Sequence, residues 1–415
     1  MHTLQQPYTM PTLLQINSTA NWGSTGRIAE QIGAVAMSHG WDSYIAYGRY
    51  VAPSKSKLIK VGSLFDSFLH LLFSRLSGHH GWYSRRATKA LIKKIEQINP
   101  DVIHLHNIHG YYINYPLLFD YLASRRKAVV WTMHDCWPFT GHCAHYHMHN
   151  CYKWQSDGCR HCKYIHDYPK ACYDHTHRNY QSKKQHFLSL GNHLTIVPVS
   201  QWLAGQFKQS FFASLRIQPI YNGVDTAIFA PTSNSNIKLR YGIADKILLV
   251  GAATVWNAAK GYDDFLRLRT KLSSRFMIML VGLSQKQIKR LPQGIIGIER
   301  TQSQQELSEI YAAADIVLSL SRQETFGLTI AEAMACGTPV IAYNTTALPE
   351  LITERTGRVV SQVGDVDGVA DAIDAIVTST KEAFSAQCRR RATTYFDKNS
   401  CSEKYITLYN ELINN

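Results

Sequence analysis

The chain is built from short apolar segments that alternate with helical patterns, and this alternation constrains its fold more than any other feature. "TLLQIN" is followed by a glycine-bearing loop and a helical stretch, and "DVIHLHNIHG", "AVVWTMHD" and "LTIVPVS" are further apolar runs that each end in polar residues. Strands that alternate with helices favour a parallel sheet covered by helices on both faces. The first half of the sequence therefore predicts a doubly wound α/β domain.

The second half repeats this pattern after a polar break. The segment "IYNGVDTAIFAPTSNSN" combines an Asn-Gly turn, a proline and a polar run, which together are typical of a linker. A chain of 415 residues also exceeds the usual size of one domain. The apolar runs beyond the linker are "KILLVGAATV", "FMIMLVGLS", "ADIVLSLS" and "TPVIAY".

We therefore expect two Rossmann-like domains, residues 1–225 and 226–397. The helical pattern of residues 398–415 is expected to cross back to the first domain. Ligands of such sheets bind at the carboxyl ends of the strands, so the two domains are expected to face a cleft that holds the substrate.

The charge of the chain is concentrated in its first part. Lys and Arg outnumber Asp and Glu by 23 to 11 in residues 1–225 but only by 21 to 19 in the remainder, and all 19 histidines lie in the first part. Such a surface favours an anionic partner, namely nucleic acid, a phospholipid surface or a phosphorylated substrate. The polar start and the absence of an apolar run of about eighteen residues predict a cytoplasmic protein without a membrane span.

The most specific segment is "SRQETFGLTIAEAMACGTPVIAYNTTALPELI". Glu324 is expected in a strand-to-helix loop, where a carboxylate can accept hydrogen bonds from sugar hydroxyls, and Glu332 is expected about two turns into the helix, within reach of a ribose. Backbone N–H groups at the helix start, over residues 327–330, would suit a diphosphate. The alternative is a pair of solvated glutamates on a surface helix.

This segment resembles the E-x7-E signature of the retaining GT-B glycosyltransferases of family four, and "NGVDTAIFAP" is similar to their interdomain segment. "DVIHLHNIHGYYIN", "WTMHDCWPFTGHC" and "SQWLA" resemble a bacterial branch of colanic-acid or O-antigen-type enzymes. The resemblance covers nearly the whole chain. It implies a GT-B fold, with two Rossmann-like domains and a final helix that crosses back.

The resemblance also implies roles for residues of the second domain. Glu324 would contact hydroxyls of the donor hexose, and Glu332 would contact the ribose of the nucleotide. Lys260 in "WNAAKG" matches the phosphate-binding lysine of the family. The backbone amides expected to hold the sugar and the diphosphate are those of Phe326, Gly327, Leu328 and Thr329.

One position departs from the family pattern. An arginine usually follows the glycine of the strand before the lysine, but here Ala252 stands in "VGAATVW". One charge of the diphosphate would then lack a partner, and we expect Arg322 to supply it.

In the first domain, Gly23 and Gly26 of "NWGSTGR" match a glycine-rich loop that lets the backbone approach the leaving diphosphate or the acceptor. His134 matches a histidine that, in the family, hydrogen-bonds the donor sugar near the reacting carbon. Without the resemblance, the simpler expectations are a plain turn and a satisfied strand-end histidine. The residues expected on the acceptor side are His106, His109 and Tyr111.

The implied reaction is the retaining transfer of a hexose or N-acetylhexosamine from a nucleotide-diphosphate sugar, with UDP preferred, to a lipid-linked glycan of a surface polysaccharide. Lys260 and the helix start would stabilise the leaving diphosphate, so no divalent cation is expected to be required. A GT-B sugar-nucleotide epimerase or phosphorylase is an alternative. A zinc-bearing nucleic-acid-binding protein is disfavoured because no reading helix is recognisable and the E-x7-E segment would be unexplained.

The segment "GSLFDSFLHLLFSRLSGHHGWYSRRATKALIKKIEQINP" joins apolar residues at helical spacing to a run of basic residues. The simpler expectation is two core-packed helices with basic outer faces. The alternative is peripheral docking on the anionic inner membrane surface, which would suit a lipid-linked acceptor.

Cysteines cluster between residues 136 and 172, where an insertion is expected. Cys143, Cys151, Cys159 and Cys162 have the spacing C-x7-C-x7-C-x2-C. In a reducing compartment this favours a closed, structural zinc site rather than disulfides. Four buried or unpaired thiols are the alternative. Histidines that could replace a cysteine as ligand are His142, His145, His147 and His161.

Overall fold

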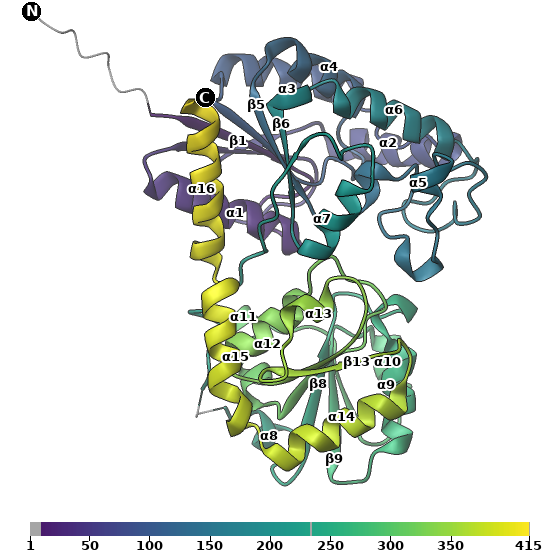
Figure 1. The fold of residues 1–415 in the computed structure, drawn as a ribbon, viewed down its shortest axis with the longest axis vertical. Coiled ribbons are helices and arrows are strands. Elements are labelled where there is room, and N and C mark those ends of the chain that lie inside the picture. Colours follow the sequence, from purple (N-terminus) through teal and green to yellow (C-terminus); the bar gives the residue numbers. More distant parts are fainter. Residues whose placement is uncertain (1–9, 233–234, 415) are drawn as a thin grey trace, which may run out of the picture. The chain divides into compact units, whose positions relative to one another are not determined.

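The structure is a computed structural model that describes residues 10–232 and 235–414. It divides into two compact units, one formed by Met1–Ile220 with Ser402–Asn415 and the other by Tyr221–Cys401. The division at Ile220 lies five residues before the boundary expected at residue 225. Each unit is a parallel sheet with helices on both faces (Figure 1). The expected fold class, α/β with two Rossmann-like domains, is confirmed.

The first unit contains a seven-stranded sheet in the order β3-β2-β1-β4-β5-β6-β7, in which every neighbouring pair is parallel. The central strands are mostly apolar and almost entirely buried, because helices cover both faces of the sheet. The strands are β1 Thr12–Asn17, β2 Asp42–Tyr47, β3 Lys57–Lys60, β4 Val102–Leu105, β5 Ala128–Met133, β6 Leu194–Pro198 and β7 Arg216–Ile217.

The longest helices of the first unit connect these strands and cover the sheet. The C-terminal helix α16, Lys398–Asn414, lies along this unit beside α1 (Figure 1). Its Tyr405 and Tyr409 are buried against Leu13 of β1 and Ile28 of α1. The helices are α1 Gly23–Ser38, α2 Leu64–Ser77, α3 Arg85–Ile98, α4 Tyr115–Arg125, α5 Lys153–Ser156, α6 Thr176–Leu188 and α7 Gln201–Lys208, with 3-10 turns η1 Trp137–Phe139, η2 His147–His149 and η3 Gly191–His193.

The second unit contains a six-stranded parallel sheet in the order β10-β9-β8-β11-β12-β13. Its strands are β8 Ile247–Ala252, β9 Phe276–Val281, β10 Ile295–Ile298, β11 Ile316–Ser319, β12 Val340–Tyr343 and β13 Gly357–Val360. Its helices are α8 Ile237–Arg240, α9 Tyr262–Lys271, α10 Gln285–Ile288, α11 Gln304–Ala313, α12 Leu328–Ala335, α13 Leu348–Leu351, α14 Val366–Ser379 and α15 Glu382–Tyr395, with the 3-10 turn η4 Ala258–Lys260.

Both sheets reverse their strand order at one point, between β1 and β4 in the first and between β8 and β11 in the second. Connections leave these neighbouring strands toward opposite faces, so a crevice forms at their carboxyl ends, where open α/β sheets bind ligands. We therefore expect a ligand-binding site of each unit to lie in the loops after these strands. The predicted cleft between the two domains stays a prediction.

Helix α2 exposes its apolar side chains, so the expectation of a core-packed helix is wrong for this element. A capping box formed by Ser63 and Asp66 starts the helix. Its buried residues are the polar Ser67, His70 and Ser74. Among the described residues, no helix is sufficiently long and apolar to cross a membrane. The large side chains that α2 leaves exposed are Leu64, Phe65, Phe68, Leu72, Phe73 and Leu76.

Candidate active site

Lys260 and Glu324 form an ion pair at the carboxyl edge of the second sheet. Lys260 ends the η4 turn in the loop after β8, and Glu324 lies in the loop after β11. The pair therefore stands at the point where the strand order reverses. Two residues 64 positions apart in sequence, each expected to contact the donor, are brought together by the topology.

Hydrogen bonds from neighbouring loops hold this pair in place. The Glu324 amide donates to Thr346 Oγ1 at 2.8 Å, and the Ala347 amide donates to the Glu324 carbonyl at 3.3 Å. Gly261, directly after Lys260, has φ +71°, and a Cβ there would lie 2.1 Å from the Leu320 carbonyl oxygen. Only glycine fits this close approach, which fixes the direction in which Lys260 leaves the turn.

Arg322 is engaged by a buried carboxylate. Its Nη2 lies 3.1 and 3.0 Å from the two Asp264 carboxylate oxygens, and the Asp264 side chain is only 1% exposed. The same guanidinium donates from Nε to the Ala258 carbonyl at 3.2 Å, and the Arg322 amide donates to the Ala259 carbonyl at 2.9 Å. Arg322 therefore supports the turn that carries Lys260. Its expected contact with the diphosphate stays a prediction.

Helix α12 begins beside Glu324 without a side-chain cap. Its N-cap is Gly327, with φ +110°, and the Ile330 and Ala331 amides bond to the Gly327 carbonyl. The amides of Leu328 and Thr329 come before the first amides that bond within the helix. The positive end of the helix dipole is therefore directed at the loop that holds Glu324. Phe326, expected to contribute its amide, is buried and packs its ring against Tyr221 and Phe396 at 5.8 and 5.6 Å between centroids.

Glu332 lies on α12 near the α11 helix. Burial raises the pKa of Tyr311 well above its ordinary value, and the nearby Glu332 carboxylate adds to this shift. Its expected contact with a ribose stays a prediction.

In the first unit, Gly23 and Gly26 begin α1 after β1. Gly23 has φ +68° and open space where a Cβ would lie, which fits a backbone exposed to a ligand. Gly26 is required for a different reason, because a Cβ there would lie 2.7 Å from Thr19 Oγ1. Packing within the loop therefore explains this second glycine.

His134 and His106 follow the neighbouring strands β5 and β4 and are linked to Gln15 in β1. His106 Nδ1 lies 3.1 Å from His134 Nε2, and His106 Nε2 lies 3.0 Å from Gln15 Oε1. Gln15 Nε2 donates to the Ala29 carbonyl at 2.8 Å. Since a carbonyl only accepts, this bond orients the Gln15 amide with its oxygen toward His106.

The orientation of the Gln15 amide determines which ring nitrogens of His106 and His134 carry a proton. An amide oxygen only accepts, so His106 donates from Nε2. Burial, His104 and His134 lower the pKa of His106 well below its ordinary value, which leaves the ring neutral and Nδ1 as an acceptor. His134 must then donate from Nε2. Burial also lowers the pKa of His134 to about 4, so at neutral pH its Nδ1 is an acceptor.

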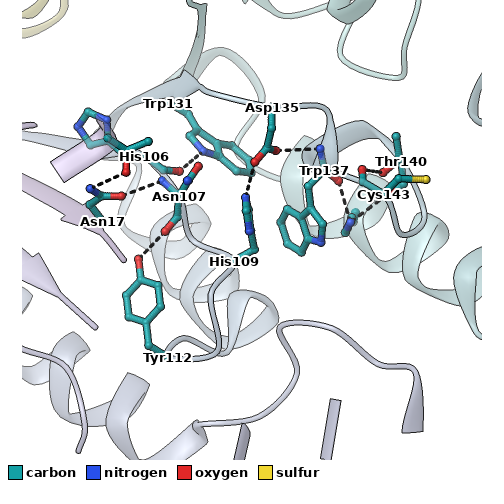
Figure 2. Close-up of polar contacts among 12 residues, drawn as sticks. Asn17, His106, Asn107, His109, Tyr112, Trp131, Asp135, Trp137, Thr140 and Cys143 are labelled. Carbon is teal, nitrogen blue, oxygen red and sulfur yellow. Dashed lines mark hydrogen bonds and ion pairs between the residues drawn. The ribbon is translucent and has the colours of Figure 1, made fainter. Parts of the chain in front are cut away.

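His109 forms an ion pair with Asp135, with 2.7 Å between Nε2 and Oδ2 and side chains 12% and 11% exposed (Figure 2). The Trp137 amide donates to the other Asp135 oxygen at 2.9 Å. The pKa of Asp135 is lowered to about 2, because the His109 charge and these hydrogen bonds outweigh its burial. Tyr111, also expected on the acceptor side, has φ +67° and packs against His70.

The loops around His106 are held by further buried hydrogen bonds (Figure 2). Trp131 Nε1 donates to the His106 carbonyl at 2.8 Å, and the Asn107 amide donates to Asn17 Oδ1 at 3.3 Å. Tyr112 donates to the Asn107 carbonyl at 2.9 Å. The carboxyl ends of β1, β4 and β5 therefore form one connected polar edge.

Comparison with protein families assigns both units. The profile described as Glycosyltransferase Family 4 matches residues 65–228, and the profile described as Glycosyl transferases group 1 matches residues 244–379. The chain belongs to the GT-B glycosyltransferases of group 1 and family 4. The glycosyltransferase is 23% identical to the putative colanic acid biosynthesis glycosyl transferase WcaC of Escherichia coli strain K12, over 96% of this chain and 100% of that protein. The resemblance seen in the sequence is confirmed at this level.

Solved structures share the fold of the glycosyltransferase. Anabaena HepE in complex with UDP superposes with a TM-score of 0.66 at 15% identity, over 97% of this chain and 100% of that chain. WaaG, a glycosyltransferase involved in lipopolysaccharide biosynthesis, superposes with a TM-score of 0.68 at 14% identity, over 96% and 99% of the two chains. Identities this low show the fold alone.

Three residues that organise the candidate site of the glycosyltransferase were missed by sequence reasoning. Gln15 is a polar residue inside the apolar run "TLLQIN", which is a detectable signal, because a buried amide in a central strand needs partners. Asp135 directly follows His134, and Asp264 stands in the first turn of a helix. Neither carboxylate has a sequence pattern that identifies its partner.

Proposed function

We propose that the glycosyltransferase moves a hexose or N-acetylhexosamine, with retention of configuration, from a nucleotide-diphosphate sugar to a lipid-linked glycan in surface polysaccharide biosynthesis. The single observation that carries this proposal is the Lys260–Glu324 pair beside the uncapped start of α12. An ammonium and helix amides suit a diphosphate, and a carboxylate suits sugar hydroxyls. The UDP bound to HepE and the likeness to WcaC support UDP as the nucleotide and a polysaccharide as the product.

In the proposed reaction, the bond between the anomeric carbon and the diphosphate breaks, and the negative charge that develops on the diphosphate is stabilised by Lys260 and the α12 amides. The acceptor hydroxyl attacks the same face of the sugar and gives its proton to a departing diphosphate oxygen. Catalysis then rests on charge stabilisation and positioning, with no covalent enzyme intermediate and no divalent cation.

In the ion pair, Glu324 already holds the Lys260 ammonium. Donor binding would replace this partner with the diphosphate and would turn the Glu324 carboxylate toward sugar hydroxyls. The pair therefore keeps two opposite charges satisfied until the donor provides a better partner for each.

His134 is proposed to accept a hydrogen bond from a hydroxyl of the donor sugar through Nδ1. Because Gln15 fixes the proton of His106, which in turn fixes that of His134, Gln15 acts as a positioning residue. His109, Asp135 and Tyr111 are proposed to face the acceptor.

Gln15→Leu is expected to lower kcat/KM for transfer by roughly tenfold. The variant leaves the buried Nε2–H of His106 without an acceptor, and an unsatisfied buried donor costs about 1–3 kcal/mol of free energy. Nitrogen-15 NMR of the histidine rings reports the tautomer and should show His106 losing its single Nε2–H form. Gln218→Leu, which removes only an exposed bond to Arg216, is the matched control. Unchanged tautomers with unchanged activity would contradict the positioning role.

Titration calorimetry with UDP, GDP and ADP tests the donor assignment directly. UDP is expected to bind most tightly, and radiolabelled UDP-sugars are then expected to label a lipid-extractable product only when a lipid-linked acceptor is present. Conversion of the nucleotide sugar without any acceptor would favour an epimerase instead. Tight binding of RNA with no sugar turnover would overturn the proposal.

The proposed acceptor is carried by a membrane, and we propose that α2 and α3 dock on that membrane. Phe65 and Phe68 of α2 are 67% and 57% exposed, although burying each ring would be favourable by about 1.5–3 kcal/mol. Exposed basic residues on α3 complement an anionic leaflet, where each contributes about 1 kcal/mol. These residues are Arg85, Arg86, Lys89, Lys93 and Lys94.

The double variant Phe65→Ser with Phe68→Ser is expected to weaken binding to phosphatidylglycerol-containing vesicles by at least about tenfold, through lost insertion of two rings. Leu239→Ser is the matched control, because Leu239 is 70% exposed on α8 of the other unit. Cosedimentation measures the binding, and added salt should weaken the wild type. Equal binding by all three proteins, or none by the wild type, would refute membrane docking through α2.

A further inference from the structure

The insertion between β5 and α6 encloses a cavity of about 240 Å³ that the proposed reaction does not use. Four cysteines from separate parts of the insertion line it, although the first and last lie nineteen positions apart. All four are free thiols. The cavity walls also include His142 and His149. The four cysteines are Cys143, Cys151, Cys159 and Cys162.

The backbone of the C-x2-C pair has an uncommon conformation, and one amide points at the sulfur of its first cysteine. Cys159 and His161 have left-handed φ values of +61° and +50°, which is uncommon for residues with a side chain. The Gly141 amide donates to Cys159 Sγ at 3.2 Å. A Cβ on Gly141 would lie 2.3 Å from the Thr176 carbonyl oxygen, so only glycine brings this amide so close. Amide donors of this kind stabilise sulfur that carries negative charge.

A buried lysine amine lies directly behind the cysteine loop. Lys183 is 0% exposed and donates to the Trp137 and Thr140 carbonyls at 2.7 and 3.0 Å, with its nitrogen 3.5 Å from the Trp137 ring centroid. Within residues 10–232 and 235–414, no carboxylate forms an ion pair with it. Burial lowers the pKa of the Lys183 amine well below its ordinary value, and the nearby Cys159, Asp135 and Cys143 side chains act in the opposite direction. Thr140, one of its two partners, also donates to the Cys143 carbonyl at 2.6 Å.

We propose that Cys143, Cys151, Cys159 and Cys162 bind one structural Zn²⁺ ion. Zinc prefers four tetrahedral thiolates in a closed site, and C-x2-C is a usual spacing for one half of it. Four thiolates around Zn²⁺ carry a net charge of −2, which would favour the protonated form of the nearby Lys183 amine. The site has no catalytic role, because four protein ligands leave no position for a substrate.

The four cysteines line the cavity, but their side chains are not yet placed as ligands of one metal ion. In the part of the chain that the structure describes, no three His, Cys, Asp or Glu side chains are gathered tightly enough to hold a metal ion as they stand. Zinc would therefore draw the four sulfur atoms inward. All four cysteines lie outside helices and strands, so the proposal requires a shift of loops and not of the sheet.

The proposed ion would fix the loop that begins at the candidate active site. The insertion starts immediately after His134 and Asp135, and the Trp137 amide donates to Asp135. The Cys136 amide bonds to the Ala144 carbonyl at 2.8 Å, next to Cys143. A zinc ion bound to Cys143 would therefore fix the end of the segment that begins next to Asp135, the partner of His109.

Metal analysis of the full chain, purified without chelators, tests the site. We expect about one zinc per chain. Cys159→Ser and Cys162→Ser should each lower zinc content at least about tenfold, because a closed site needs all four ligands. Cys172→Ser is the matched control, since Cys172 is exposed in the same insertion but does not line the cavity.

A second measurement remains informative if the serine variants fail to fold. Wild-type protein refolded with Co²⁺ should show the thiolate charge-transfer absorption of a tetrahedral cobalt site. Folded wild-type protein that contains no metal and four reactive thiols would overturn the proposal, and so would disulfides among these cysteines in mass spectra. Neither result bears on the proposed glycosyl transfer, which is measured separately.

Discussion

Lys260→Ala is expected to lower kcat/KM for sugar transfer by roughly 10²–10³-fold, because it removes the cation that pairs with Glu324 at the proposed site of the leaving diphosphate. The loss should fall mainly on kcat, since charge on the diphosphate increases as the glycosidic bond breaks. The affinity for UDP should fall by a smaller factor. Initial rates with a radiolabelled UDP-sugar, together with calorimetry of UDP binding, measure both effects.

Two further variants sharpen this test. Lys271→Ala is the matched control, because Lys271 lies on the next helix and also pairs with a carboxylate, Asp367, but on the exposed surface. It should retain wild-type rates. Glu324→Gln should reduce kcat/KM for the sugar donor while leaving UDP affinity nearly intact, since the carboxylate is proposed to contact the sugar. Equal losses in Lys260→Ala and Lys271→Ala would refute the assignment of Lys260.

Acid is expected to destabilise the first unit far more than the second. Burial lowers the pKa of His70 to about 3 and of His80 to about 2, and it lowers the pKa values of His104 and His106 well below the ordinary value. In the unfolded chain these rings titrate near pH 6.5, so the unfolded state binds protons that the folded state excludes as the pH falls below 6.5. The free energy of unfolding must then decrease toward low pH.

The size of this effect follows from linkage. At pH 5 each fully buried neutral histidine removes up to about 2 kcal/mol from the free energy of unfolding, so four histidines remove several kcal/mol. The second unit contains no histidine. Hydrogen exchange followed by mass spectrometry should therefore show that the first unit loses protection between pH 7.5 and pH 5. The second unit should keep its protection over the same range.

A variant pair connects this loss to the buried rings. His80→Leu removes one titrating group and should reduce the difference in stability between pH 7.5 and pH 5. His39→Gln is the control, because His39 lies at the surface beside Glu403. Equal acid sensitivity of both units, or a pH dependence that His80→Leu leaves unchanged, would contradict the account.

The strands, and the loop positions of Lys260 and Glu324, could be predicted from the sequence because their signals are local. A parallel strand buried on both faces is a continuous apolar run, and the polar residues that end such runs fall at the carboxyl edge of the sheet. Lys260 and Glu324 lie in the loops after β8 and β11. These two strands are neighbours in the sheet, at the point where the strand order reverses, so their loops come together.

Other features depend on contacts that no local pattern contains. Gln15 and His106 are 91 positions apart, and Arg322 and Asp264 are 58 apart. Arg322 is expected to contact the diphosphate because Ala252 replaces the usual arginine, and no local pattern shows that the buried Asp264 carboxylate also engages Arg322. Helix α2 was misread because helical spacing identifies an apolar face but not whether anything covers that face.

The anomeric configuration of the product tests the central claim most directly. Wild-type protein would be incubated with UDP-α-sugars and the lipid-linked glycan fraction, and the new linkage would be determined by the proton–carbon coupling of its anomeric centre in NMR. We predict an α-linked sugar, formed with retention and without added divalent cation. A β-linked product, or release of free sugar with no linkage to the lipid-borne glycan, would contradict the proposed function.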